Sequence, residues 1–220
     1  MNQNKYPIYL LSFDTDYLAA ATFLRFQEHY ESPKFRDQIF DLEAYMDWYA
    51  AERDGFTYFD DWSGFNLPDR VLDAFLAGRF DPLTRKEKAL LDLFRKVPKP
   101  FYVIGAAKGE TDTMAHEIVH GLFYVRPDYR EEVVACLKRF EWSKVWRILA
   151  KTGYDPSVFD DEINAYCLTG FEGRLATQKK LIKAARRQLV PIFTKHFGWP
   201  PDEKNWPKLL KLVHHIDFRY

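Results

Sequence analysis

Residues 114–124, MAHEIVHGLFY, place two histidines and a carboxylate among apolar side chains. His116 and His120 stand four positions apart, a separation that puts both side chains on the same face of a helix. Glu117 follows the first histidine, about 100° further around the helix axis. Because apolar residues occupy the neighbouring positions, we expect this helix to be buried, and buried polar side chains need partners.

Two imidazoles on one helix face can bind a single Zn²⁺ ion, at the ~2.0–2.1 Å typical of Zn–N bonds. From its offset position, Glu117 can reach a zinc-bound water molecule without binding the ion itself. The carboxylate then takes the proton of that water as the water attacks a carbonyl carbon. This is the chemistry that the pattern His-Glu-x-x-His predicts on a helix. The alternative is that both histidines belong to the core and hydrogen-bond to neighbouring groups.

A catalytic zinc site needs a third protein ligand and leaves one position to water. The pattern H-x-x-G-x-x-H would provide a third histidine, but Phe123 and Arg126 stand where its glycine and its last histidine should be. We therefore expect the third ligand to come from another element, with a carboxylate as the usual choice.

The best candidate for this ligand lies in the segment 155–170, DPSVFDDEINAYCLTG. Its first two residues suit the start of a helix and its final glycine suits the end. On such a helix Glu162 lies in the middle of the apolar face, whereas Asp160 lies on the far side and Asp161 on the flank. An unpaired carboxylate in an apolar face is costly, and a cation removes that cost. The alternative is a salt bridge from Glu162 to an arginine or a lysine.

The patterns around these two segments predict a mostly helical α+β domain with a small sheet. Residues 54–68 are expected to form a loop or a short hairpin. Pro191 is expected to kink or end a long helix that starts at about 172. Strands are expected at 7–13 and 101–106. The helix that contains residues 116–120 is expected to have Thr111 or Asp112 as its N-cap. The other helices are expected at about 15–29, 40–53, 68–78, 83–97, 127–140, 143–154, 155–170, 172–195 and within 206–220.

We expect one domain that spans residues 1–220. Within it, residues 101–170 form the metal-binding core. Residues 1–100 form an N-terminal part to which the sequence assigns no role, and residues 171–220 form C-terminal helices.

Composition excludes several classes of partner. The 32 lysines and arginines balance the 32 aspartates and glutamates, so neither nucleic acid nor an anionic membrane is an expected partner. No apolar run approaches the ~18 residues of a membrane helix, and the N-terminus is unlike a signal peptide. The expectation is a soluble, cytoplasmic protein. Cys136 and Cys167 are expected to be buried free thiols.

The motif and the later glutamate together resemble the zincin metallopeptidases, and among them the gluzincin branch. HEIVH at 116–120 matches the metal helix of that family, and EINA at 162–165 is similar to a Glu-x-x-Ala pattern on its second metal helix. The resemblance implies a zincin-like fold, His116, His120 and Glu162 as zinc ligands, and Glu117 as general base. Tyr166 stands where many relatives carry the acid or amide that orients a histidine, so this partner is left open.

The resemblance also implies a substrate-binding strand and a group that stabilises the oxyanion. The strand 101–106 would be an edge strand that pairs with an extended substrate. A tyrosine, histidine or arginine would stabilise the negative charge that develops during attack. Tyr166 is the expected residue, and the other candidates are Tyr124, Tyr154 and His196.

Three further features have structural interpretations. The pair His214-His215 is expected to lie on the surface, near the end of a basic helix. The basic segment 179–187 is expected to be a charged helix face rather than a nucleic-acid site. The aromatic residues of 45–65 are expected to pack in the core, with a substrate cleft as the alternative.

The sequence therefore predicts a zinc-dependent hydrolase, a metallopeptidase that cleaves an amide bond in a protein or peptide substrate. One alternative is a non-catalytic binding or regulatory module that keeps the scaffold. Another is a zinc hydrolase acting on a non-peptide bond. The identity of the substrate and the oligomeric state are left open.

Overall fold

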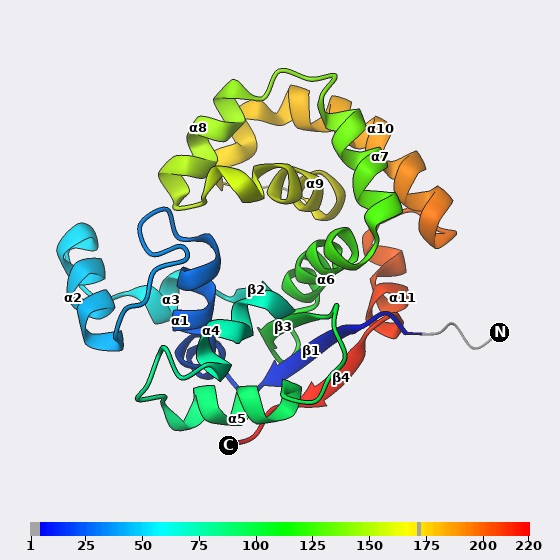
Figure 1. The fold of residues 1–220 in the computed structure, drawn as a ribbon. Coiled ribbons are helices and arrows are strands. Elements are labelled where there is room, and N and C mark those ends of the chain that lie inside the picture. Colours follow the sequence, from blue (N-terminus) through cyan, green and yellow to red (C-terminus); the bar gives the residue numbers. More distant parts are fainter. Residues whose placement is uncertain (1–4, 171–172) are drawn as a thin grey trace.

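A computed structural model describes residues 5–170 and 173–220 and contains one four-stranded mixed sheet with the strand order β2-β3-β1-β4 (Figure 1). β1 runs parallel to both β3 and β4, whereas β2 runs antiparallel to β3. The strands are β1 (Ile8–Phe13), β2 (Gly64–Pro68), β3 (Tyr102–Ala107) and β4 (His214–Asp217).

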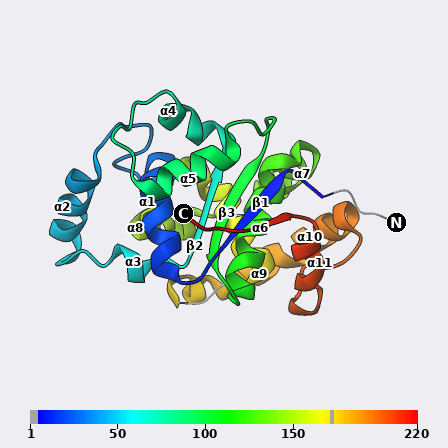
Figure 2. The same cartoon turned by 90° about the horizontal axis from the view of Figure 1, so that it is seen from below.

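Helices cover both faces of this sheet, and a further group of helices lies beyond α6 (Figure 1). α2 stands at one end of the molecule, away from α10 and α11, in both Figure 1 and Figure 2. The α-helices are α1 (Asp16–Glu31), α2 (Leu42–Arg53), α3 (Tyr58–Asp61), α4 (Leu72–Leu76), α5 (Arg85–Phe94), α6 (Thr111–Val125), α7 (Pro127–Leu137), α8 (Ser143–Thr152), α9 (Phe159–Thr169), α10 (Lys179–Phe197) and α11 (Trp206–Lys211).

The predicted α+β class is confirmed, but one part of the prediction is wrong. The strand before the histidine helix, β3, is not an edge strand, because β2 pairs with it along its outer side. Residues 54–68, predicted as a loop or hairpin, instead contain α3 and β2. The glycines, aspartates and asparagine of that segment favour turns, and the long-range pairing with β3 overrides that local preference.

Local signals explain why the main elements begin where they do. The Thr15 hydroxyl accepts a hydrogen bond from the Leu18 N–H at the start of α1. Thr84 and Glu87 form a reciprocal capping box at the start of α5. All six residues of β3 are buried, which suits a strand covered on both faces.

Two glycines allow α1 and α6 to pack closely against the sheet. A Cβ atom on Gly105 of β3 would lie 2.3 Å from the ring of Phe23 on α1. A Cβ atom on Gly121 of α6 would lie 3.0 Å from the side chain of Ile8 on β1. α6 therefore lies directly on the sheet, so the side chains on its outer face point away from the sheet toward α9.

The C-terminal part differs from the prediction at two points. Residues 214–217 form the edge strand β4 rather than part of a helix, and the ring of His214 stacks on Tyr9 of β1 with centroids 4.9 Å apart. The pairing with β1 decides this, because α11 ends at Lys211 and leaves the following residues free to pair. Both histidines remain at least partly exposed, as expected for the surface.

Pro191 lies inside α10, which continues to Phe197, so the prediction that it could end the helix is wrong. A proline lacks only one N–H, and the packing of α10 against α7 and α9 supports the helix beyond it. The predicted helix start at residue 172 lies outside the described residues. A 3₁₀ turn spans Gly173–Gln178, before the α-helix begins at Lys179.

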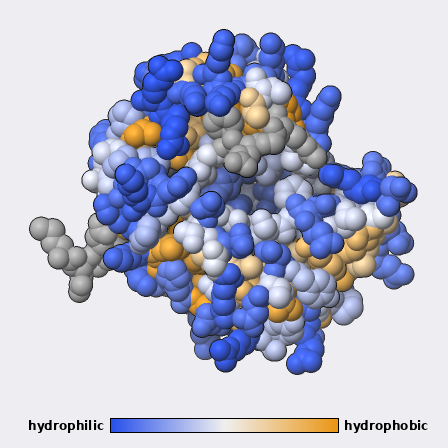
Figure 3. Space-filling view, turned by 180° about the vertical axis from the view of Figure 1, so that it is seen from behind, coloured by the Kyte–Doolittle hydropathy of each residue, from blue (hydrophilic) through white to orange (hydrophobic). Residues whose placement is uncertain are grey.

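The hydrophilic surface and the two buried cysteines agree with what the composition predicts. Hydrophilic residues predominate on the face shown in Figure 3, with apolar residues in small groups. Within residues 5–170 and 173–220, no helix has the length and apolar character that crossing a membrane requires. Cys136 and Cys167 are both buried and free, as predicted.

Candidate metal centre

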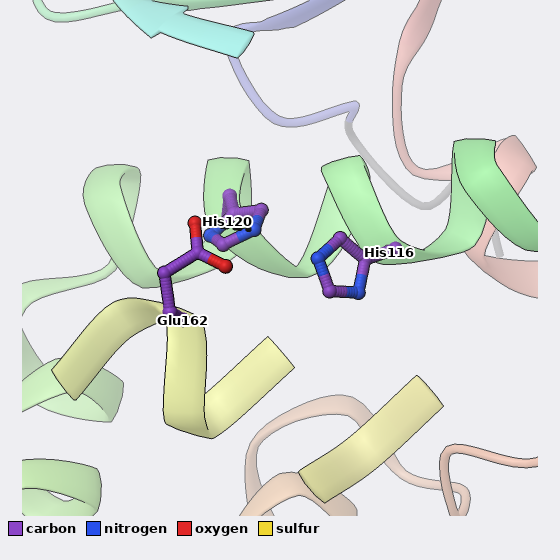
Figure 4. Close-up of side chains that lie close together, drawn as sticks. All are labelled: His116, His120 and Glu162. Carbon is purple, nitrogen blue, oxygen red and sulfur yellow. Dashed lines mark ion pairs between the residues drawn. The ribbon is translucent and has the colours of Figure 1, made fainter. Parts of the chain in front are cut away.

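The three side chains predicted as zinc ligands converge in space from two helices (Figure 4). His116 and His120 extend from one face of α6, and Glu162 extends toward them from α9. One possible ligand atom from each residue can be chosen so that all lie within 4.8 Å of one another. The closest cross-helix approach is 3.6 Å, between Nε2 of His120 and Oε1 of Glu162. α6 begins at Thr111 and its N-cap is Glu110, so the prediction that Thr111 or Asp112 caps this helix is wrong.

A hydroxyl group on α9 orients the first imidazole. Nδ1 of His116 lies 2.9 Å from Oγ1 of Thr169. The Thr169 hydroxyl itself donates to the carbonyl oxygen of Ala165, at 2.9 Å, so it accepts a hydrogen bond from the histidine. With the proton on Nδ1, the lone pair of Nε2 is available to a metal ion. Burial and the neighbouring His120 lower the pKa of His116 well below its usual value, which keeps the ring neutral.

The second imidazole lies between two acids of α9. Nδ1 of His120 lies 2.9 Å from Oδ1 of Asp161. Its other nitrogen faces Glu162. Burial lowers the pKa of His120, but attraction by Asp161 and Glu162 outweighs it and raises the pKa well above the usual value. Asp161, predicted on the flank of α9, therefore has a specific partner.

The buried carboxylate of Glu162 has one oxygen without a hydrogen-bond donor among the described residues. Its side chain is 3 % exposed, and its Oε2 atom has no hydrogen-bond partner in the described part of the chain. Burial raises the pKa of Glu162 to about 8, against the opposing effect of His120. A buried oxygen without a donor is costly, and a cation between Glu162 and the two histidines would remove that cost. Two imidazoles and one carboxylate form a donor set that suits catalytic zinc.

Contacts from the sheet hold Glu117 beside this donor set. The Asn66 side-chain amide on β2 donates to Oε2 of Glu117 at 2.6 Å. The Tyr102 hydroxyl donates to the Asn66 oxygen, which fixes the direction of the amide. A Cβ atom on Gly64 would lie 2.4 Å from Oε1 of Glu117, so only glycine leaves room for the carboxylate here. Burial raises the pKa of Glu117, while His120 and the Asn66 hydrogen bond lower it.

Two adjacent hollows, which share part of their walls, surround the donor set. An inner pocket of about 40 Å³ contains His120 and Glu162 in its wall, and an outer cleft of about 770 Å³ passes His116 and Glu117. The residues that line both hollows are Trp62, Gly64, His116, Glu117 and Tyr154. The first histidine and the glutamate of the motif therefore stand where the cleft meets the pocket.

Two of the four oxyanion candidates lie at this junction. The hydroxyls of Tyr154 and Tyr166 lie 3.5 Å apart, and the Tyr166 ring lies 4.8 Å from the His116 ring. Burial raises the pKa of both tyrosines, so each keeps its proton and can donate a hydrogen bond. Tyr124 instead donates to Asp69 at 2.7 Å. His196 does not line either hollow and lies 3.1 Å from Glu132.

The aromatic segment 45–65 is mainly structural, as predicted. Tyr45, Tyr49 and Tyr58 are buried, and their rings pack against one another. Trp62 lines both hollows, and Tyr58 and Phe65 also line the inner pocket. The alternative prediction, that aromatic residues of this segment line a substrate cleft, therefore applies to the end of the segment.

Sequence reasoning missed several residues around the centre. Asn66, Gln27 and Glu31 come from the N-terminal part, to which no role was assigned, and they reach the site only through the packing of β2 and α1. Thr169 follows Glu162 by seven positions, about two helical turns, which is the one local signal that could have placed it near the histidines.

Comparisons with family models, with curated proteins and with solved structures give no match to this chain. The resemblance to zincins therefore rests on the motif, and the geometry of the centre is the basis for a functional argument.

Proposed function

We propose that this protein is a zinc-dependent hydrolase that cleaves amide bonds in peptides. The observation that carries the proposal is the buried Glu162 carboxylate, which faces two imidazoles and has an oxygen without a donor. His116, His120 and Glu162 would hold the zinc ion. When bound, the ion supplies a positive charge that polarises a carbonyl group and acidifies a water molecule.

The side chains around the centre have separate roles in this proposal. Glu117 accepts the proton of the attacking water and transfers it to the leaving amine. Asn66 holds the Glu117 carboxylate through a 2.6 Å hydrogen bond. Tyr166 and Tyr154, which both line the cleft and whose hydroxyls lie 3.5 Å apart, would donate hydrogen bonds to the oxyanion. Thr169 and Asp161 position the two imidazoles.

The outer cleft, rather than the sheet edge, is the proposed path of the peptide. On the edge strand β2, the Asn66 N–H already donates to the Gln27 side chain at 3.1 Å, and Pro68 has no N–H. Few donors are left for a peptide that adds to this edge as a strand. The cleft of about 770 Å³ has room for several residues of an extended chain.

A second candidate is a non-catalytic module in which no metal binds. The contacts of His120 with Asp161 and Glu162 favour it, because a buried imidazolium could balance these acids on its own. Metal analysis separates the candidates. The hydrolase is expected to retain a single zinc ion after purification, whereas the module would contain none.

The decisive variant is Glu117→Gln, which removes the base and keeps the size of the side chain. We expect zinc content to be unchanged and hydrolysis of a casein or peptide mixture to fall by ~10²–10⁴-fold, the usual contribution of a general base. Glu131→Gln, at an exposed position on α7, is the matched control and should retain full activity. Full hydrolysis by the Glu117→Gln protein would contradict the assignment.

A further inference from the structure

The inner pocket contains an acid that the proposed reaction does not use. Glu31, the last residue of α1, is 8 % exposed and lines the pocket together with Glu162. Within the described residues, its carboxylate receives a single hydrogen bond, from the Gln27 amide to Oε1. Gln27 is itself fixed, because its oxygen accepts the Asn66 N–H. Glu31 is therefore held in one orientation at the wall of the pocket.

Glu31 is not one of the residues that could together hold the metal ion. Among the described residues, the group of three or more possible ligands whose donor atoms all lie within 4.8 Å of one another consists of His116, His120 and Glu162. Glu31 nevertheless lines the same inner pocket as all three of these residues. A substrate group that enters the pocket beside the ion position can therefore contact the Glu31 carboxylate.

The acidic side chains that line the pocket favour a second positive charge there in addition to a zinc ion. The acids that line it are Glu28, Glu31, Glu117 and Glu162, and no lysine or arginine lines it. A divalent ion balances Glu162 and Glu117, which leaves Glu28 and Glu31 without a metal as counter-charge. Glu28 has hydrogen bonds with Tyr45, Ser32 and Tyr58, whereas Glu31 has the single bond from Gln27. The outer cleft adds Asp61, Asp112 and Glu203, and no lysine or arginine lines it either. Both hollows therefore disfavour a carboxylate on the substrate.

The sizes of the hollows indicate which part of a substrate enters the pocket. About 40 Å³ is room for a small group and not for a peptide that continues in both directions. The outer cleft, which shares His116 and Glu117 with the pocket, is much larger. A peptide that extends from the cleft into the pocket must accordingly end there, and the acid in the pocket matches an amino end.

From this geometry we propose that the inner pocket binds the protonated amino end of a peptide, with Glu31 as the residue that positions it. The proposal rests on the hydrolase function proposed above and makes the protein an aminopeptidase. Water adds its oxygen to the first carbonyl carbon, and the bond from that carbon to nitrogen breaks. One proton of the water passes through Glu117 to the leaving nitrogen. The products are a free amino acid and a peptide with a new amino end.

The first test uses the unmodified protein with zinc and three forms of one neutral peptide. One form has a free amino end, one is N-acetylated, and one is N-acetylated with an internal lysine. We expect kcat/KM for the free form to exceed that for the acetylated form by ~10–100-fold, the range for a hydrogen bond to a charged group. Equal cleavage of the free and acetylated forms overturns the proposal. Preference for the internal lysine overturns it as well, because the ammonium group would then come from a side chain.

The second test measures binding rather than turnover. The peptides are titrated calorimetrically into the Glu117→Gln protein, with and without zinc. The free form is expected to bind at least ~10-fold more tightly than the acetylated form, and Glu31→Gln added to this protein should remove the difference. Glu52→Gln, at an exposed position on α2, is the control and should preserve it. A preference that persists after Glu31→Gln overturns the role of Glu31.

These two tests separate the proposals. If no peptide is hydrolysed but binding depends on the free amino end and on Glu31, the hydrolase proposal fails and the amine pocket stands. If peptides are hydrolysed regardless of acetylation, the hydrolase proposal stands and the amine pocket fails. The comparison between acetylated and free peptides needs no variant at Glu31, so a folding defect in that variant does not affect it.

Discussion

Glu117 shows how a single side chain depends on contacts from outside its own motif. The sequence places it on the helix beside His116, and β2 supplies the amide of Asn66 that orients it. Without that amide, a buried carboxylate would lack a donor and would be free to rotate away from the centre. The chemistry expected of the motif therefore depends on a residue 51 positions earlier in the chain.

Replacement of Asn66 by alanine should change the pH dependence of the reaction. The hydrogen bond from Asn66 favours the ionised form of Glu117 and so lowers the pKa of this carboxyl. Its loss raises that pKa, and because the base must be ionised, the acidic limb of the kcat/KM profile should move to higher pH. Activity at neutral pH should fall by ~10–100-fold, the usual effect of losing such a partner. If the acidic limb of the profile stayed at the same pH, Asn66 would not be the residue that lowers the pKa of Glu117.

Thr169→Val tests the partner of His116. Valine keeps the shape of threonine but cannot accept the hydrogen bond from Nδ1 of His116. Zinc affinity, measured by competition with a chelator, should fall by ~10–100-fold. The matched control is Thr194→Val on α10, whose hydroxyl makes the same type of bond to the carbonyl four residues earlier. Equal affinities in the two variants would show that the Thr169 contact does not orient the ring.

At the scale of elements, β2 and the end of α1 bring the N-terminal part to the site. β2 carries Gly64 and Asn66, and α1 carries Gln27 and Glu31. Gln27 joins the two elements through its bond to the Asn66 N–H. A displacement of α1 would consequently disturb both the base and the proposed amine pocket, which makes the anchoring of α1 important.

A buried ion pair anchors α1 to α5. The Arg25 guanidinium makes two 2.6 Å hydrogen bonds to the Glu87 carboxylate and a further bond of 3.0 Å to the carbonyl of Phe80. Both side chains are almost fully buried, so Arg25→Met would leave Glu87 buried without its partner. Urea unfolding should show a loss of about 3–5 kcal/mol. Arg95→Met removes an exposed pair with Asp92 and should cost at most about 1 kcal/mol. Similar losses in both variants would contradict the anchoring role.

At the scale of the whole molecule, the candidate centre lies between the sheet with α6 and the outer layer of helices that contains α9 (Figure 1). The acids collected at this boundary tend to destabilise the folded chain, because burial disfavours their charged forms. A bound cation would offset part of this cost. Stability and ligand binding should therefore be linked at this boundary.

Glu28, which lines the inner pocket, should make stability fall as the pH rises. Burial raises its pKa from 4.5 to about 7, against hydrogen bonds from Tyr45, Ser32 and Tyr58. Between these values the folded protein retains a proton that the unfolded chain releases, so stability decreases with rising pH. Glu28→Gln should remove this loss and gain on the order of 1–3 kcal/mol at pH 8 relative to pH 5. Urea unfolding of both proteins at the two pH values checks this, and parallel curves would contradict it.

Strong periodic and capping signals made most of the fold predictable. The strands β1 and β3, the helices α1, α2, α5 and α6, and the end of α9 at Gly170 lie where the sequence indicates. β2 and β4 were missed because each is a short edge strand with weak local preference. Their backbones pair with β1 and β3, which are distant in the chain, so tertiary contacts rather than local preference decide their conformation.

The residues of the motif determine the donor set, since the spacing of His116 and His120 on a helix brings both rings to one face whatever surrounds them. The helical wheel likewise pointed to Glu162. Only the tertiary structure decided which hydroxyl orients His116, which amide holds Glu117 and which acid lines the inner pocket. Those partners come from elements far apart in the chain, and contacts of that kind depend on packing, which local sequence patterns do not encode.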